Sequence, residues 1–178
     1  MEKEEINQII QRLNQKFQSI LNTISIEEIY DFSFYLKWLL QKTDLYVKSK
    51  KYQKGDDYKK LGHFKRGDIV RVNFGYNIGT EKNKIRYAIV LDKYNPNTLG
   101  SVVVVPITSK NNRTVQQKSC IFVGKIDSLD GNNSYVDIAN IKSISKLRII
   151  STCGKVNNKI LDKIDKKIVE LYINNIDF

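Results

Sequence analysis

Residues 101–108 read Ser-Val-Val-Val-Val-Pro-Ile-Thr, and this stretch decides the fold class. Valine is β-branched, and β-branched residues favour extended strands over helices. Comparable runs follow or precede it at residues 69–74, 86–91, 118–123, 134–138 and 149–154. Gly, Asn and Asp separate these runs, as hairpin connections require. The pattern predicts five or six short antiparallel strands.

Helical patterns flank the strands on both sides. Near the C-terminus, apolar residues recur at helical spacing over residues 159–174 and predict a covering helix. The first 47 or so residues also read as helix, and a capping box from Ser25 to Glu28 opens a second helix there. We therefore expect an α+β protein: a small antiparallel SH3-like β-barrel with a C-terminal helix, preceded by an N-terminal helical hairpin.

The chain divides by composition into three parts. Residues 1–47 form the N-terminal helical region, residues 48–63 a basic linker, and residues 64–178 the barrel domain. The second predicted helix is too apolar to stand alone in water, so the first helix, the barrel domain or another chain must cover it. Core packing is favoured over a partner-binding groove, and a solvated connector is favoured over a nucleic-acid tail for the linker.

Charge is distributed unevenly along the 178 residues. The net charge is +11, and residues 1–62 contribute +2 whereas residues 63–178 contribute +9. A basic surplus of this kind suits a polyanionic partner. No run approaches the roughly 18 apolar residues that cross a bilayer, and the acidic N-terminus lacks the order of a signal peptide. We expect a cytoplasmic protein without membrane contact.

Metal and thiol chemistry have little support in the sequence. Cys120 and Cys153 fit no zinc or redox spacing, so we expect two small core residues. His63 is the single histidine and has no carboxylate cluster beside it. These shortages argue against a metal site, a cofactor, a histidine-pair nuclease and a cysteine-histidine hydrolase. Any catalysis must use other groups.

Two of the predicted loops carry basic and aromatic side chains suited to RNA. Basic groups neutralise phosphates, and aromatic rings stack on unpaired bases. In the loop at residues 75–84 and the loop at residues 109–117, the candidates are Tyr76, Lys82, Lys84, Ser109, Lys110 and Arg113.

Five segments in order resemble the MazF/PemK toxins of toxin–antitoxin systems. They begin with Arg-Gly-Asp-Ile-Val-Arg at 66–71, Ile-Arg-Tyr-Ala-Ile-Val-Leu at 85–91 and Val-Pro-Ile-Thr-Ser at 105–109. The block at 134–149 and Cys-Gly-Lys-Val at 153–156 complete the series. The resemblance covers about residues 64–178, close to a whole domain of that family.

The resemblance implies a metal-independent endoribonuclease that cuts single-stranded RNA at short sequences. In this family the second-strand arginine and the third-strand threonine or serine line the active site, which here are Arg86 and Thr108, with Ser109 beside them. Cleavage by attack of the 2′-hydroxyl leaves a cyclic phosphate and a 5′-hydroxyl. The resemblance also implies a homodimer that a cognate antitoxin inhibits.

The sequence departs from the family pattern at several positions. Tyr87 stands where proline usually follows the arginine, and Asn140 and Lys142 stand where glutamine and arginine are typical. Typical members also lack the helical extension before Leu61. Two other functions stay open: a non-catalytic gyrase binder like the CcdB toxins, or a basic barrel that only binds nucleic acid.

Overall fold

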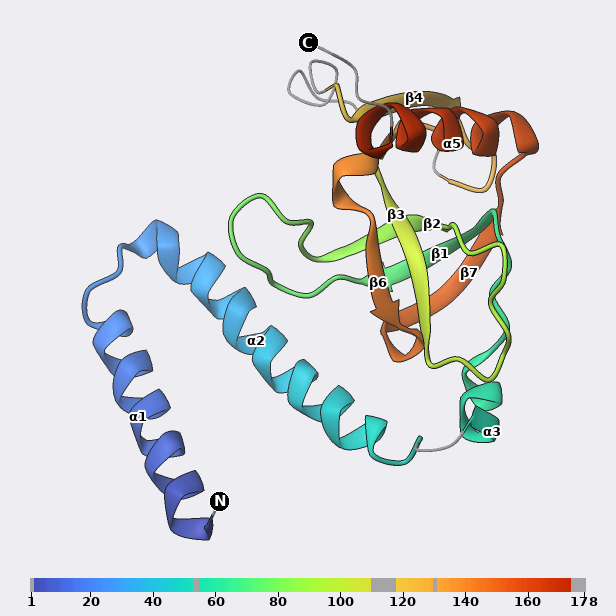
Figure 1. Ribbon diagram of the computed structural model, residues 1–178. Helices are drawn as coiled ribbons and strands as arrows, with labels where there is room; N and C mark the ends of the chain where they lie inside the picture. Colours follow the sequence, from blue (N-terminus) through green and yellow to red (C-terminus); the bar gives the residue numbers. More distant parts are fainter. Residues whose placement is uncertain (1, 53–54, 110–117, 130, 174–178) are drawn as a thin grey trace. The chain divides into compact units, whose positions relative to one another are not determined.

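The computed structural model describes residues 2–52, 55–109, 118–129 and 131–173 (Figure 1). The chain forms two units, residues 1–41 and residues 42–178. In the described part of the chain, no helix combines the length and the apolar character needed to cross a membrane.

The first unit contains α1 (Lys3–Leu21) and most of α2 (Ile26–Ser49). The predicted capping box is confirmed: the Ser25 amide and hydroxyl each donate to Glu28 Oε2 over 2.9 Å, and the Glu28 amide donates to Ser25 Oγ over 3.3 Å. The backbone hydrogen bond from Ser25, followed by its side-chain bond, lowers the pKa of the Glu28 carboxyl. Phe17 of α1 meets Phe32 of α2 edge to face at 6.2 Å between ring centres.

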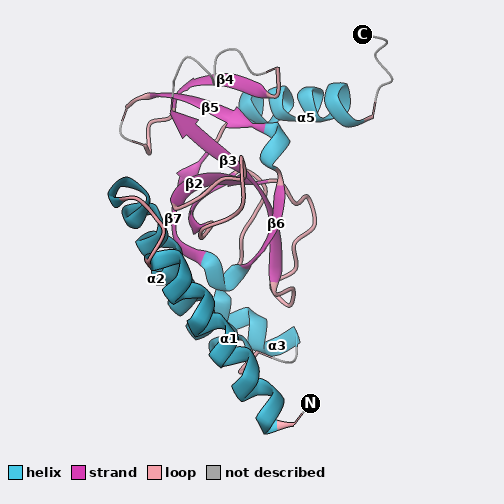
Figure 2. Cartoon of the chain, turned by 90° about the vertical axis from the view of Figure 1, so that its left-hand side faces the viewer, coloured by secondary structure: helices cyan, strands magenta, loops and turns pink. Residues whose placement is uncertain are grey.

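The second unit is an antiparallel sheet of seven strands (Figure 2). The strands are β1 (Asp68–Asn73), β2 (Ile85–Val90), β3 (Ser101–Ser109), β4 (Cys120–Lys125), β5 (Asn133–Asp137), β6 (Lys142–Ser145) and β7 (Ile149–Lys155). Their order is β4-β5-β3-β2-β1-β7, and β6 also pairs with β3. The six predicted strands all form, and β6 is an addition that the sequence pattern did not predict.

Strand β3 divides one of its edges between two partners. Its first half pairs with β6, from Ser101↔Ser145 to Val104↔Lys142, and its last three residues pair with β5. Pro106 lies between the two ladders and has no backbone N–H to donate. A proline is tolerated here because the pairing partner changes at this point.

The expected SH3-like β-barrel is not confirmed, because the sheet is not closed. Within the described residues, the strand path ends at β4 on one side and at β7 on the other, and no ladder joins these two strands. The physical reason is that the edge of β3 is divided between two partners. Strand β6 pairs with its first half, whereas β5, which pairs in turn with β4, takes its last three residues. The predicted α+β class with a C-terminal helix and N-terminal helices is confirmed.

Apolar side chains are buried on both faces of the sheet. Alternate residues of one strand therefore enter different clusters: Val70 and Val72 enter the cluster that includes Phe74, while Ile69 enters the cluster under the C-terminal helix. That helix is α5 (Asn158–Tyr172), which both views show beside β4. Asn157 caps it, accepting from the Ile160 amide at 3.1 Å.

The segment before the sheet is folded against it. It contains α3 (Gly55–Tyr58) and a 3-10 turn (Lys59–Leu61). The Tyr58 ring lies so close to Gly100 that a Cβ at Gly100 would approach it to 2.6 Å. The division into a helical region, a linker at 48–63 and a barrel domain stays a prediction. Cys120 and Cys153, expected in the core, are both partly exposed.

Candidate functional site

The hairpin between β1 and β2 is held in shape by its own polar groups. The Lys84 amide donates to the Gly75 carbonyl over 2.7 Å, and the Phe74 amide donates to the Lys84 carbonyl over 3.0 Å. The Asn77 side-chain amide donates to the carbonyls of Phe74 and Lys82, at 3.0 and 2.8 Å. Lys84 adopts a φ of 68°, the left-handed region that non-glycine residues seldom enter. The loop therefore has a defined conformation where it leads into Arg86.

Register brings Arg86 and Thr108 together. Strands β2 and β3 pair antiparallel from Val90↔Val104 to Ala88↔Pro106, so two further residues place Thr108 opposite Arg86. Both positions lie two residues beyond a matched pair, so they share one face of the sheet. The sequence predicted these two residues as the catalytic pair, and they lie on neighbouring strands, on the same face of the sheet.

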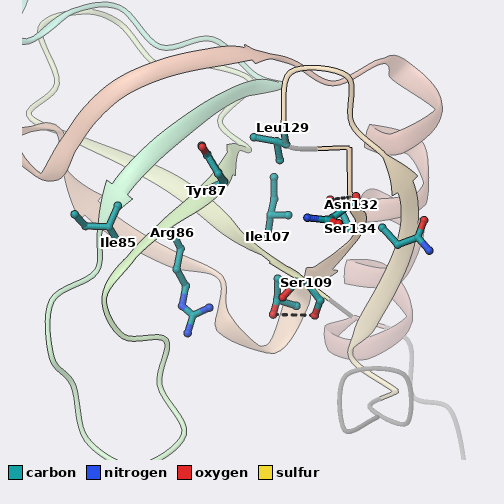
Figure 3. Close-up of a pocket in the computed structure, with 10 residues that line it drawn as sticks. Ile85, Arg86, Tyr87, Ile107, Ser109, Leu129, Asn132 and Ser134 are labelled. Atoms are coloured by element: carbon teal, nitrogen blue, oxygen red, sulfur yellow. Dashed lines mark hydrogen bonds between the residues drawn. The ribbon is translucent and has the colours of Figure 1, made fainter. Parts of the chain in front are cut away.

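The two side chains line a common hollow of about 230 Å³ (Figure 3). Three elements build its walls: the start of β2, the end of β3, and the segment leading into β5. Figure 3 shows Arg86 and Ser109 on one side of Ile107, with Tyr87 on the other side. The lining residues are Ile85, Arg86, Tyr87, Ile107, Thr108, Ser109, Leu129, Asn132, Asn133 and Ser134.

A backbone carbonyl fixes one end of the Arg86 guanidinium. Arg86 Nε donates to the Asn83 carbonyl over 2.8 Å. In the described part of the chain, no hydrogen bond occupies its two terminal nitrogens. A planar fork held at Nε presents those nitrogens to a phosphate. The Thr108 hydroxyl is partly exposed, and its one weak contact is with the Ser109 carbonyl at 3.5 Å.

The predicted RNA-binding residues lie in several different settings. Lys84 and Ser109 are exposed and Tyr76 is partly buried. Lys82 Nζ lies 2.6 Å from Asp137 Oδ2, so its charge faces a buried carboxylate. Lys110 and Arg113 lie outside the described residues.

Sequence reasoning missed the third wall of the hollow. Leu129, Asn132, Asn133 and Ser134 enter it from beyond β4, far along the chain from Arg86. Asn132 and Asn133 carry a turn signal that predicted a loop before β5. The pairing of β5 with the end of β3 brings this loop to the site, and no local pattern encodes that pairing.

Other polar residues near the site have structural partners. Arg148 Nε donates to the Asn73 carbonyl over 2.9 Å, and its NH2 group donates to the Phe74 carbonyl. These two bonds hold the end of β1, where the hairpin loop begins. Burial lowers the pKa of the Arg148 guanidinium. Arg66 joins the Leu91 carbonyl and Asp165 of α5.

Metal-binding groups are not gathered near the hollow. Over the described ranges, no three His, Cys, Asp or Glu side chains are placed to share a metal ion. Burial, and then the neighbouring Asp137 carboxylate, raise the pKa of the Cys120 thiol.

Comparison with known protein families identifies the second unit. Residues 65–172 match the family described as PemK-like, MazF-like toxin of type II toxin-antitoxin system. The chain belongs to this family. The matched range contains every described strand, α5 and all residues that line the hollow.

Solved structures with a similar fold are distant in sequence. An endoribonuclease in complex with its cognate antitoxin, from Mycobacterial species, is 20% identical, with 61% of this chain and 93% of that chain covered and a TM-score of 0.48. MazF from Deinococcus radiodurans is 18% identical, with 60% and 94% covered and a TM-score of 0.48. A MazE–MazF structure from the same organism is 20% identical, with 60% and 93% covered and a TM-score of 0.44. No curated protein matches the chain.

Proposed function

We propose that this toxin-family protein is a metal-independent endoribonuclease that cuts single-stranded RNA at short specific sequences. The observation that supports the proposal is the hollow that Arg86 of β2 and Thr108 of β3 line together. Family membership supports the same activity, because solved relatives by fold include proteins named as endoribonucleases. RNA supplies its own nucleophile, the 2′-hydroxyl. The protein therefore has to position the ribose, stabilise the charge on the phosphate oxygens and move protons.

In the proposed reaction, the 2′-hydroxyl oxygen attacks the adjacent phosphorus in line with the leaving 5′-oxygen. The bond from phosphorus to that 5′-oxygen breaks, leaving a 2′,3′-cyclic phosphate and a 5′-hydroxyl end. The proton lost by the 2′-hydroxyl balances the proton gained by the leaving oxygen. Negative charge grows on the phosphate oxygens in the transition state, and stabilising it is the main task of the protein.

Arg86 and Thr108 suit that task in different ways. The terminal nitrogens of Arg86 match two phosphate oxygens as a planar fork, held in orientation at Nε by the Asn83 carbonyl. The Thr108 hydroxyl donates from the end of a strand, so its position is fixed before the substrate arrives. Arginine has too high a pKa to serve easily as a base. We therefore assign Arg86 the stabilisation of phosphate charge as its main role, with proton donation to the leaving oxygen as a secondary role.

RNA binding is proposed to extend from the hollow over the neighbouring loops. Tyr76 would stack on a base, while Ser109 and the cations Lys84, Lys110 and Arg113 would contact the phosphate chain. Lys82 was predicted with them, but its charge faces the buried Asp137 carboxylate, so we leave it out of the phosphate contacts. A homodimer acting in the cytoplasm and inhibited by a cognate antitoxin completes the proposal. RNA and antitoxin would compete for the same basic surface.

The deciding experiment measures cleavage in the absence of metal. Purified protein is incubated with a long single-stranded RNA in excess EDTA, and the product ends are mapped. We expect cuts at a short recurring sequence with 2′,3′-cyclic phosphate ends. Arg86→Ala should lower kcat by about 10²–10³-fold, since it removes a group that stabilises transition-state charge.

A matched control removes one positive charge elsewhere. Lys166 is exposed on α5 and does not line the hollow, so Lys166→Ala should cleave like the unchanged protein. Cleavage that needs Mg²⁺ would overturn the metal-free mechanism. Absence of cleavage across a broad range of RNA sequences would favour a non-catalytic toxin or a nucleic-acid-binding protein.

A further inference from the structure

A buried carboxylate lies behind the hairpin loop of the candidate site. Asp137, the last residue of β5, is 2% exposed, and its Oδ2 lies 2.6 Å from Lys82 Nζ. Asn140 also donates to Oδ2 over 3.1 Å, while Oδ1 is buried without a hydrogen-bond partner among the described residues. A charge withdrawn from water in this way depends strongly on its counter-charge. Lys82, itself 20% exposed, supplies that charge.

The residue next to Lys82 makes a contrasting contact. Glu81 pairs with Lys142 at 2.7 Å, but both side chains are largely exposed, at 52% and 40%. Ion pairs in water contribute little, whereas separating a buried carboxylate from its counter-charge is costly, because it leaves the buried charge uncompensated. The loop is therefore anchored to the end of β5 chiefly through Lys82.

The anchor is one residue away from the group that orients Arg86. Asn83 follows Lys82 directly, and its carbonyl accepts the hydrogen bond from Arg86 Nε over 2.8 Å. The Asn83 side chain also accepts from the Asn77 amide over 2.6 Å, which fixes the same peptide from the other side of the loop. A continuous series of contacts thus runs from Asp137 through Lys82 and Asn83 to Arg86.

We propose that Asp137 is a positioning residue for the Arg86 guanidinium, acting through Lys82. Asp137 does not line the hollow, so it has no direct route to the substrate. Without the pair, the loop loses its anchor, the Asn83 carbonyl moves, and the guanidinium turns away from the phosphate. The functional part of this inference rests on the proposed endoribonuclease activity. It also gives Lys82 a role that differs from direct RNA contact.

The test separates positioning from binding by measuring kcat and KM. Asp137→Asn keeps the size of the side chain and an acceptor for Asn140, but removes the charge that holds Lys82. We expect kcat to fall about 10- to 100-fold, which is the size of effect expected when a catalytic group is displaced by a small distance. KM should change less than about twofold, since ground-state contacts with RNA remain. Lys82→Met should have the same effect, and Lys82→Arg should restore most of kcat.

Two controls make the result decisive. Glu81→Gln breaks the neighbouring exposed pair and should leave kcat and KM unchanged. The double variant Lys82→Met with Asp137→Asn leaves no buried charge without a partner, so it should fold like the unchanged protein and still lose kcat. A rise in KM with constant kcat in Lys82→Met would overturn the proposal in favour of direct RNA contact. Unchanged kcat in Asp137→Asn would overturn it outright.

A second measurement is independent of cleavage. In ¹⁵N-labelled protein without RNA, the hydrogen bond to Asn83 should slow solvent exchange of the Arg86 Nε–H, and Asp137→Asn should speed that exchange roughly tenfold. Glu81→Gln should leave it unchanged. If the unchanged protein cleaves no RNA but shows this difference, the proposed function fails and the positioning contact stands. Equal exchange in all three proteins would overturn the contact.

Discussion

At the scale of single residues, Thr108 offers the sharpest test of the hollow. Its hydroxyl is partly exposed at the end of β3, opposite Arg86, and makes only a weak contact with its neighbour. Thr108→Val keeps the β-branched shape and removes the donor. We expect kcat for RNA cleavage to fall by about 10²-fold, the typical effect of losing one donor to a transition-state oxygen.

A conservative variant provides the control for that prediction. Thr108→Ser keeps the hydroxyl and should retain kcat within about fivefold, because the strand still fixes the Cβ and only the rotamer preference weakens. Urea unfolding should show that the valine variant is folded. Full activity of Thr108→Val would remove the hydroxyl from the mechanism and leave Arg86 to act with other donors.

Residue patterns predicted part of the candidate site. Arg86 and Thr108 could be assigned because each lies on a strand whose neighbours matched a family pattern. Asp137 could not be assigned, because in the sequence it is one polar residue at the end of a short strand. Its buried pair with Lys82 depends on how the hairpin loop folds back onto β5. Such contacts between distant segments leave no periodic signal.

At the scale of elements, α5 is tied to the sheet by its apolar stripe. Ile164 is fully buried in the cluster beneath the helix, together with Ile160 and Leu161. Ile164→Ala should lower the free energy of unfolding by about 2–5 kcal/mol, since it removes buried methyl groups and leaves a cavity. Chemical unfolding by urea measures the change.

The opposite face of α5 gives the matched comparison. Lys166 is exposed, and alanine is a good helix former, so Lys166→Ala should change the unfolding free energy by less than about 0.5 kcal/mol. Similar losses for both variants would mean that α5 is not held by its apolar stripe.

Element predictions were most accurate where periodicity was strong. The runs of Val and Ile gave β1, β2 and β3 to within one residue, and the spacing of Ile160 and Ile164 gave α5. Strand β6 was missed because Lys-Ser-Ile-Ser has a single apolar residue, Ile144. The number of strands led us to expect a barrel, which is not confirmed, because strand count alone does not specify which strands pair. The division of the β3 edge is a property of the assembled sheet.

At the scale of the whole molecule, the two units differ in net charge. Residues 1–41 carry 4 basic and 6 acidic groups, whereas residues 42–178 carry 26 basic and 13 acidic groups. Each phosphate that the protein neutralises releases a bound cation into solution, and this release is less favourable at higher salt. RNA binding should therefore weaken as the salt concentration rises. With about four phosphate contacts, the logarithm of the binding constant should fall against the logarithm of salt with a slope of roughly −3.

Fluorescence anisotropy with a labelled, uncleavable 2′-deoxy oligonucleotide measures that slope. A backbone-neutral oligonucleotide of the same sequence is the control, and its binding should be weak and nearly independent of salt. Salt-independent binding of the charged oligonucleotide would contradict the assignment of the basic surface to phosphate contacts.

The shared strand β3 makes the chemistry inseparable from the stability of the domain. Val102 and Val104 belong to one apolar cluster, Val105 and Ile107 belong to the other, and Thr108 follows directly. Neither cluster can melt alone without drawing this strand out of the other, so the two behave as one cooperative unit. The candidate site should therefore be lost only together with the fold: as long as β3 stays paired and both clusters stay packed, Thr108 keeps its place at the end of the strand.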